Sequence, residues 1–180
     1  MLLEPQKQVY DQFLSKIYRK NKGIITLNAA LGESDGFLNL YKIGFSNSRW
    51  ATGLATFDRS VLEKAFASGH VAKNAAKENI AVPDNPDEQI AVEKVPLIST
   101  KTLLSTYNIK HIDLLQIDTE GFDYEIIKLF DIPTTRPGLI VFENSHLPEK
   151  TLAEAVAFLQ ANHYETTTSG ANTVARLLID

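Results

Sequence analysis

The sequence contains no cysteine, which excludes disulfides and every metal site built on thiolates. It also contains no run of about 18 apolar residues, the length that a membrane-spanning helix requires. The 18 lysine and arginine residues are outnumbered by 22 aspartate and glutamate residues. The resulting net charge of −4 argues against broad binding to nucleic-acid phosphates. We therefore expect neither nucleic acid nor membrane among the partners. The lack of cysteine fits a reducing compartment, so the expected location is the cytoplasm.

The composition is that of an ordinary globular protein. Of the 180 residues, 44% are apolar and 22% are charged. This length suffices for one domain with a substantial core. No linker, repeat or low-complexity segment divides the chain, so we predict a single domain over residues 1–180.

Apolar strands alternate with helices along the chain. The pattern predicts strands over residues 23–31, 37–43, 89–98, 112–118, 138–144, 163–169 and 173–179. It predicts helices over residues 5–19, 60–69, 99–109, 122–130 and 151–162. Such alternation is typical of crossover units around a largely parallel sheet. The remaining long polar segments, residues 44–53 and 70–87, are predicted loops, and we expect the second to be mobile and to close over a ligand.

Two of the predicted strands end in polar residues. One ends at Asp118, and another ends at Glu143 and Asn144. In an open parallel sheet, ligands bind beyond the carboxyl ends of the strands. If these two strands are neighbours, their ends gather five side chains into an acidic group with one imidazole: Asp118, Glu120, Glu143, Asn144 and His146.

A purely structural interpretation of the same residues stays open. Asp118 and Thr119 could cap the helix that follows, with Glu120 favoured by the positive end of the helix dipole. His146 could be a hydrogen-bonding residue of a surface loop. Spacing alone does not choose between these roles and a functional site.

One stretch resembles a known family signature. Residues 112–130, IDLLQIDTEGFDYEIIKLF, resemble the signature of the FkbM family of S-adenosylmethionine-dependent methyltransferases, a strand ending in Asp-x-Glu-Gly before a helix. Three more stretches are similar to the family in order and spacing: residues 3–13, 25–41 and 136–144. The resemblance implies an α/β fold with a Rossmann-like class I methyltransferase sheet, mostly parallel with an antiparallel last strand, in three α/β/α layers.

The sequence also departs from the family pattern. Gln116 stands where the family usually has lysine. The family begins with a strand and a glycine-rich loop for the cofactor, a unit of about 30 residues that has no counterpart in this sequence. The resemblance therefore implies a domain truncated at its N-terminus, the C-terminal portion of the family domain. We expect such a chain to bind S-adenosylmethionine poorly and to be inactive alone.

The resemblance assigns roles to individual residues. Glu4 would bind the ribose hydroxyls of S-adenosylmethionine, and Asn28 and Ala29 would lie near its adenine. Asp118 would sit beside the transferred methyl group and the acceptor. Glu143 or His146 would act as the base that takes the acceptor's proton. The implied reaction is O-methylation of a hydroxylated small molecule or a sugar.

Other possibilities remain beside this hypothesis. No metal is assigned, although Asp118, Glu143 and Asn144 are similar to the ligand set of magnesium-dependent catechol O-methyltransferases. The chain could instead be a non-catalytic binding or assembly module derived from the methyltransferase fold, or a different transferase that uses the same acidic residues. Finally, sheet edges left open by a missing strand would invite pairing, so a homo-oligomer is also expected.

Overall fold

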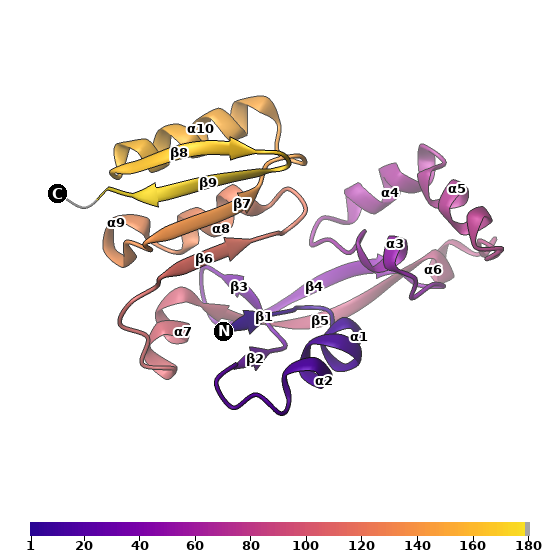
Figure 1. The fold of residues 1–180 in the computed structure, drawn as a ribbon. Coiled ribbons are helices and arrows are strands. Elements are labelled where there is room, and N and C mark those ends of the chain that lie inside the picture. Colours follow the sequence, from indigo (N-terminus) through magenta and orange to yellow (C-terminus); the bar gives the residue numbers. More distant parts are fainter. Residues whose placement is uncertain (179–180) are drawn as a thin grey trace. The chain divides into compact units, whose positions relative to one another are not determined.

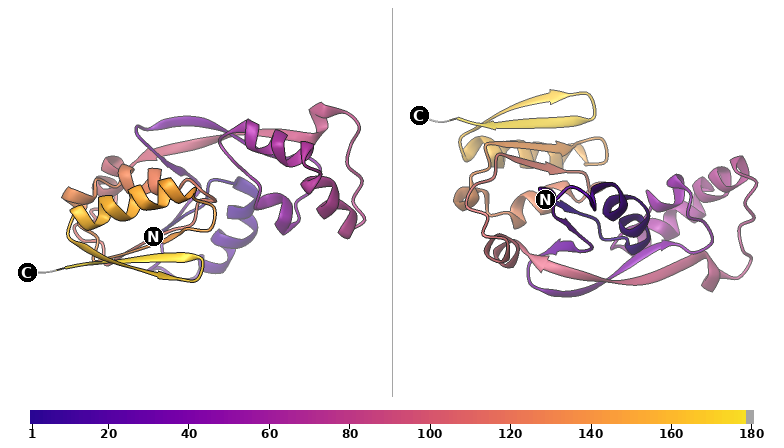
Figure 2. Two further views of the ribbon diagram at one scale, coloured as in Figure 1. Left: turned by 90° about the horizontal axis from the view of Figure 1, so that it is seen from above. Right: turned by 60° about the horizontal axis from the view of Figure 1, so that its bottom comes forward.

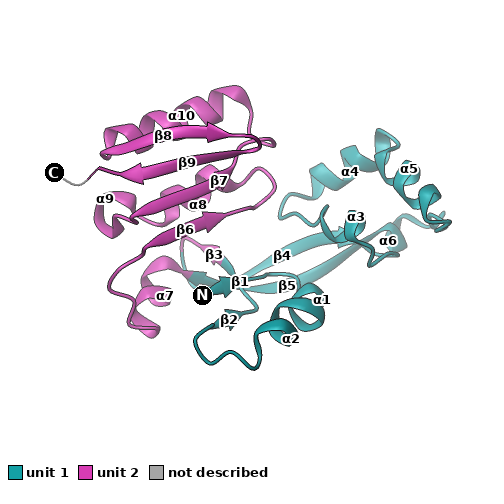
Figure 3. Cartoon of the chain, viewed as in Figure 1, with its two compact units in different colours: residues 1–30, 34–98 teal, residues 31–33, 99–180 magenta. Residues whose placement is uncertain are grey.

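The computed structural model describes residues 1–178 and divides the chain into two compact units (Figure 3). Unit 1 comprises residues 1–30 and 34–98, and unit 2 comprises residues 31–33 and the described residues from 99 onward. Both units combine strands with helices, which confirms the predicted mixed α/β class. No helix in the described part of the chain is long and apolar enough to cross a membrane.

Unit 1 begins with a strand, a helix and a parallel strand. Strand β1 (Leu2–Leu3) pairs in parallel with β2 (Thr26–Leu27). Between them runs one helical segment in three parts: α1 (Lys7–Val9), the π-helical η1 (Tyr10–Leu14) and α2 (Ser15–Tyr18). This confirms the helix predicted over residues 5–19. The strand predicted over residues 23–31 is interrupted after Leu27, and β3 (Ala30–Gly32) follows the break.

The rest of unit 1 is built on a long antiparallel ribbon. Strand β4 (Gly36–Ile43) pairs with β5 (Ile90–Ser99) in a register that runs from Gly36 opposite Leu97 to Ile43 opposite Ile90 (Figure 1). Two buried clusters pack on this ribbon. The first contains Ile43, Ala51, Leu62 and Val71. The second contains Ala30, Leu40 and Val95.

Three short helices of unit 1 were not predicted. They are α3 (Arg49–Thr52), α5 (His70–Lys77) and α6 (Pro86–Gln89). The loop predicted over residues 70–87 is therefore wrong in its first half, because Val71 and Ala75 lie one turn apart and bury one side of α5. That the segment is mobile and closes over a ligand stays a prediction.

The helix predicted over residues 60–69 is present as α4 (Arg59–Ala67). The carboxylate of Asp58 accepts a hydrogen bond from the backbone N–H of Ser60, so Asp58 is the N-cap of this helix. Gly69, at φ 75°, then separates α4 from α5. That left-handed conformation suits glycine because it has no Cβ.

Unit 2 contains a four-stranded sheet in the order β6-β7-β9-β8. Its strands are β6 (Leu114–Ile117), β7 (Leu139–Glu143), β8 (Tyr164–Ser169) and β9 (Asn172–Leu177). Strands β6 and β7 are parallel, and β9 is antiparallel to both β7 and β8. All four were predicted, and the last residue of the strand predicted over 173–179 lies outside the described residues.

Helices α8 and α10 lie against the same face of this sheet (Figure 2). The helices of unit 2 are α7 (Thr100–Thr106), α8 (Asp123–Leu129), the unpredicted α9 (Ile132–Thr135) and α10 (Glu149–Ala161). Alternate residues Leu115 and Ile117 are buried, whereas Leu114 remains 51% exposed on the other face. Helix α10 begins at Glu149, two residues before the start of the helix predicted over residues 151–162.

The buried face of β7 should dominate the stability of unit 2. Replacing Phe142, which has no exposed surface, by alanine leaves a cavity, and we expect the free energy of unfolding to fall by about 3–5 kcal/mol. Phe122→Ala is the matched control, because that ring is 50% exposed, and we expect a loss below about 1 kcal/mol. Urea denaturation followed by circular dichroism measures both variants. Equal losses would contradict this placement of the core.

Candidate acid–imidazole site

The pairing of β6 with β7 sets the geometry of the candidate site. The two strands are parallel neighbours, and Ile117 lies opposite Phe142. Asp118 follows β6, and Glu143 is the last residue of β7, so both reach the same carboxyl edge of the sheet. The condition under which the sequence gathers these residues, that the two strands are neighbours, is therefore met. The edge is where ligands of open α/β sheets bind.

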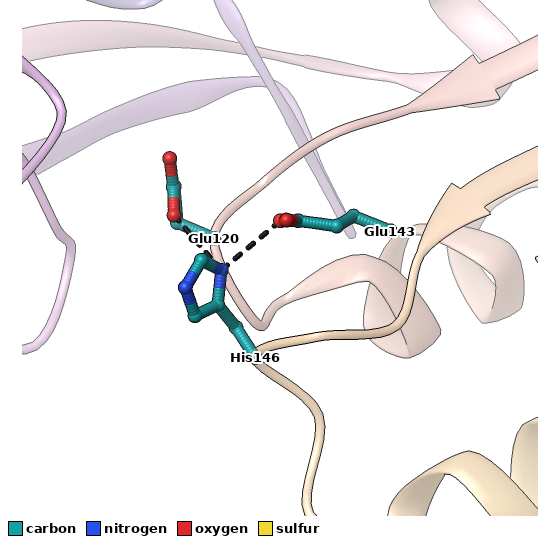
Figure 4. A group of neighbouring side chains, drawn as sticks. All are labelled: Glu120, Glu143 and His146. Atoms are coloured by element: carbon teal, nitrogen blue, oxygen red, sulfur yellow. Dashed lines mark hydrogen bonds and ion pairs between the residues drawn. The ribbon is translucent and has the colours of Figure 1, made fainter. Parts of the chain in front are cut away.

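Three side chains converge beyond this edge (Figure 4). The Nδ1 atom of His146 lies 3.0 Å from Oε2 of Glu143 and 3.0 Å from Oε2 of Glu120. Glu143 is the most sheltered of the three, with 19% of its side chain exposed, whereas Glu120 and His146 are about half-exposed. The hydroxyl of Ser145 donates a further hydrogen bond to Glu143 Oε1. The structure thus unites Glu120, Glu143 and His146, which we call the acid–imidazole group.

The protonation of this group is biased toward an imidazolium between carboxylates. The hydrogen bond to Glu143 raises the pKa of His146 above its ordinary value, and the nearby carboxylate charges add to that effect against the opposing influence of burial. The Ser145 hydroxyl and His146 lower the pKa of Glu143. Burial, together with the charge of Glu143, raises the pKa of Asp118. Burial also raises the pKa of Glu120, although His146 opposes the shift.

The group could also hold a metal ion. One carboxylate oxygen from each glutamate and one ring nitrogen of His146 all lie within 4.8 Å of one another. Oxygen and imidazole ligands suit several divalent cations. This set differs from the predicted alternative of Asp118, Glu143 and Asn144, with which it shares only Glu143. The Asn144 Nδ2 donates to Thr173 Oγ1 on β9 at 3.0 Å.

Asp123, which the sequence analysis did not select, is fully buried beneath the group. Its Oδ2 accepts hydrogen bonds from Thr119 Oγ1 at 3.0 Å and from the Gly121 N–H at 3.3 Å. Its Oδ1 accepts the Glu143 N–H at 3.2 Å. An acid in the first helical turn has an ordinary explanation in the helix dipole, so the sequence offered no distinct signal.

The structural interpretation of Asp118 and Thr119 as helix caps is wrong. The N-cap position of α8 is Phe122, and no side chain accepts a hydrogen bond there in the described structure. The Thr119 hydroxyl donates to Asp123 and is not a cap for the helix N–H groups. Both residues therefore belong to the turn between β6 and α8.

The predicted cofactor residues lie in unit 1. Glu4 follows β1, where its Oε1 accepts the Gln6 N–H at 2.8 Å, and burial raises the pKa of this carboxyl. Asn28 follows β2, and its Nδ2 donates to the carbonyls of Glu4 and Pro5, at 2.9 Å each. Ala29 is buried. The structure thus brings Glu4 and Asn28 together, with the Asn28 amide fixing the backbone that follows β1.

Comparison with known proteins gave one match. A family model described as Methyltransferase FkbM domain matches residues 2–166 of the 180. No curated protein and no solved structure matches the chain. The matched stretch contains the acid–imidazole group, Asp123 and the Glu4 region.

The carboxylates should control the titration of His146. We expect NMR to give a pKa above 6.5 for its ring, and Glu143→Gln to lower that pKa because the hydrogen bond that chiefly raises it is weakened. Asp113→Asn is the control, since it removes an exposed carboxylate beside His111. An unchanged pKa in Glu143→Gln would contradict the ion pair.

The raised pKa of His146 also sets the direction in which stability changes with pH. Folding raises the pKa of His146, so its ion pairs contribute fully below pH 6.5, and the contribution disappears as pH rises through the raised value. The amount is small, about 0–1 kcal/mol, because the pair is half-exposed. Denaturation of the wild type and of His146→Gln on both sides of that window measures it.

Proposed function

The chain belongs to the FkbM methyltransferase family, and from this premise we propose that it acts in S-adenosylmethionine-dependent O-methylation of a hydroxylated small molecule or a sugar. The observation that carries the proposal is the convergence of Glu120, Glu143 and His146 at the carboxyl edge of two parallel strands. A base at this edge suits an acceptor that must lose a proton during transfer.

The arrangement of unit 2 supports a Rossmann-like class I methyltransferase sheet. Parallel β6 and β7 are followed by the β8–β9 hairpin, and β9 lies antiparallel between β7 and β8. In unit 1 the parallel pair β1 and β2 fits the same pattern. A mostly parallel sheet with an antiparallel last strand is the arrangement that the family resemblance implies.

The acid–imidazole group supplies a base with a defined tautomer. The carboxylates of Glu143 and Glu120 face Nδ1 of His146, so they favour the proton on that atom. Nε2 of the neutral ring is then the acceptor for the substrate hydroxyl proton. As the imidazolium forms, the same two carboxylates stabilise its charge, and Asp118 adds to the negative field.

The methyl donor brings its own chemistry. When bound, S-adenosylmethionine supplies a methyl group on a positively charged sulfur, which an acceptor oxygen can displace in line. The protein's part is to orient the acceptor oxygen and to remove its proton through His146. Glu143 keeps the ring in place while this proton moves.

Glu4 fits the role of a ribose ligand. Its Oε1 is held by the Gln6 N–H, and its Oε2 accepts no hydrogen bond from the described residues. A carboxylate in this state at the carboxyl end of a strand can accept hydrogen bonds from ribose hydroxyls. Both donors of the Asn28 amide are taken by backbone carbonyls, so Asn28 positions the Glu4 segment and does not donate to adenine.

Titration with S-adenosylmethionine followed by NMR tests the cofactor assignment. We expect shifts at the amides of Glu4 and Gln6, and we expect Glu4→Gln to abolish them. Glu63→Gln on α4 is the exposed control. The absence of any shift would contradict the role of Glu4.

Because this chain is expected to be inactive alone, the base is tested by a methyl-transfer assay in a protein that also carries the family's glycine-rich cofactor-binding unit. We expect His146→Gln to lower the rate about 10²–10⁴-fold with hydroxylated acceptors. The wild-type rate should rise with pH through the raised pKa of His146, since only the neutral ring accepts a proton, and this rise should be missing in the variant. Glu165→Gln, in the exposed β8–β9 hairpin, should leave the rate unchanged. A His146→Gln enzyme with the wild-type rate and pH profile would overturn the assignment.

A further inference from the structure

Asp123 is a fully buried carboxylate with an unusual set of partners. A buried charged group is costly unless hydrogen bonds satisfy it. Asp123 accepts three, and its two oxygens serve different segments of the chain. Oδ2 binds the turn that carries Glu120, and Oδ1 binds the end of the strand that carries Glu143.

The turn segment is held in a strained shape around Glu120. Glu120 has φ 53°, in the left-handed region that costs a residue with a Cβ about 1–2 kcal/mol. The two donors to Oδ2 come from Thr119 and Gly121, the residues immediately before and after it. Asp123 therefore fixes Glu120 from both sides and offsets the strain of its backbone.

The same turn lies against the segment of His146. Gly121 has φ 102°, and a Cβ at this position would lie 3.2 Å from the carbonyl oxygen of His146. Glycine therefore allows the close approach of the two backbones. The second oxygen of Asp123 holds the Glu143 N–H at 3.2 Å, three residues before His146 in sequence.

We propose that Asp123 is a positioning residue that sets Glu120 and Glu143 at the distances from which both contact His146. One carboxylate ties together the two segments that supply the acid–imidazole group. The expected effect of Asp123 on the rate of methyl transfer rests on the proposed function. Its expected effect on the titration of the His146 ring does not. A purely structural Asp123 would stabilise the start of α8 and leave His146 unaffected.

The test compares Asp123→Asn with Glu125→Gln, which changes another acid in the first turn of α8. The asparagine keeps the size of the side chain, but its NH₂ group cannot accept from the donors that one carboxylate oxygen serves. We expect the NMR-measured pKa of His146 to fall toward 6.5 in Asp123→Asn and to stay at its wild-type value in Glu125→Gln. In the methyl-transfer assay, kcat should fall about 10–100-fold with little change in KM for the cofactor.

Thr119→Val provides a second variant if Asp123→Asn does not fold. It removes one donor to Oδ2 with almost no change in shape, and we expect the same direction of change in the His146 titration at a smaller size. A folded variant at either position with an unchanged His146 titration would overturn the proposal. A shifted titration would uphold the positioning role even if the protein transferred no methyl group with the family's cofactor-binding unit present, and that second result would overturn the proposed function.

Discussion

Parallel pairing of β6 with β7 is the constraint on which the candidate site depends. Ile117 and Phe142 lie opposite each other and are buried under the helices of unit 2, so the register of the two strands is fixed by their apolar faces. If one strand slipped by one residue, its apolar side chains would turn to the other face of the sheet. Because the register is fixed, Asp118 and Glu143 must reach the same edge. The chemistry of this edge is therefore a consequence of the core beneath it.

The sequence predicts the two strands and their polar ends, but it leaves their pairing as a condition and does not predict the group that results from it. The apolar runs that end at Asp118 and Glu143 identified the two strands and the polar residues at their carboxyl ends. The convergence of Glu120 on His146 depends on a left-handed turn, and Asp123 owes its role to contacts across the sheet edge. Neither is encoded in a local period. The missed helix α5 has a similar cause, since its short apolar side is hidden among polar residues.

Electrostatics then give the clustered acids different properties. Glu143 receives hydrogen bonds from Ser145 and His146, which lower its pKa, while Asp118 and Glu120 lose solvent and face like charges, which raise theirs. The imidazole is the one ring that the group contains, and it offers a single proton to two carboxylates at equal distance. Such a group favours a positive charge at its centre, either an imidazolium or a cation.

The two units handle polar strand ends by the same physical means. In unit 1 the Asn28 amide satisfies the carbonyls of Glu4 and Pro5, and in unit 2 the Asp123 carboxylate satisfies donors on both sides of Glu120. In each unit, one polar side chain makes the hydrogen bonds that hold the backbone or the turn beside the strand end. The neighbouring carboxylate then keeps an oxygen for other partners: solvent or a ligand at Glu4, and the His146 ring at Glu120. A rigid backbone beside an available carboxylate is what a binding edge requires, because ordering the acid only upon binding would weaken its contribution.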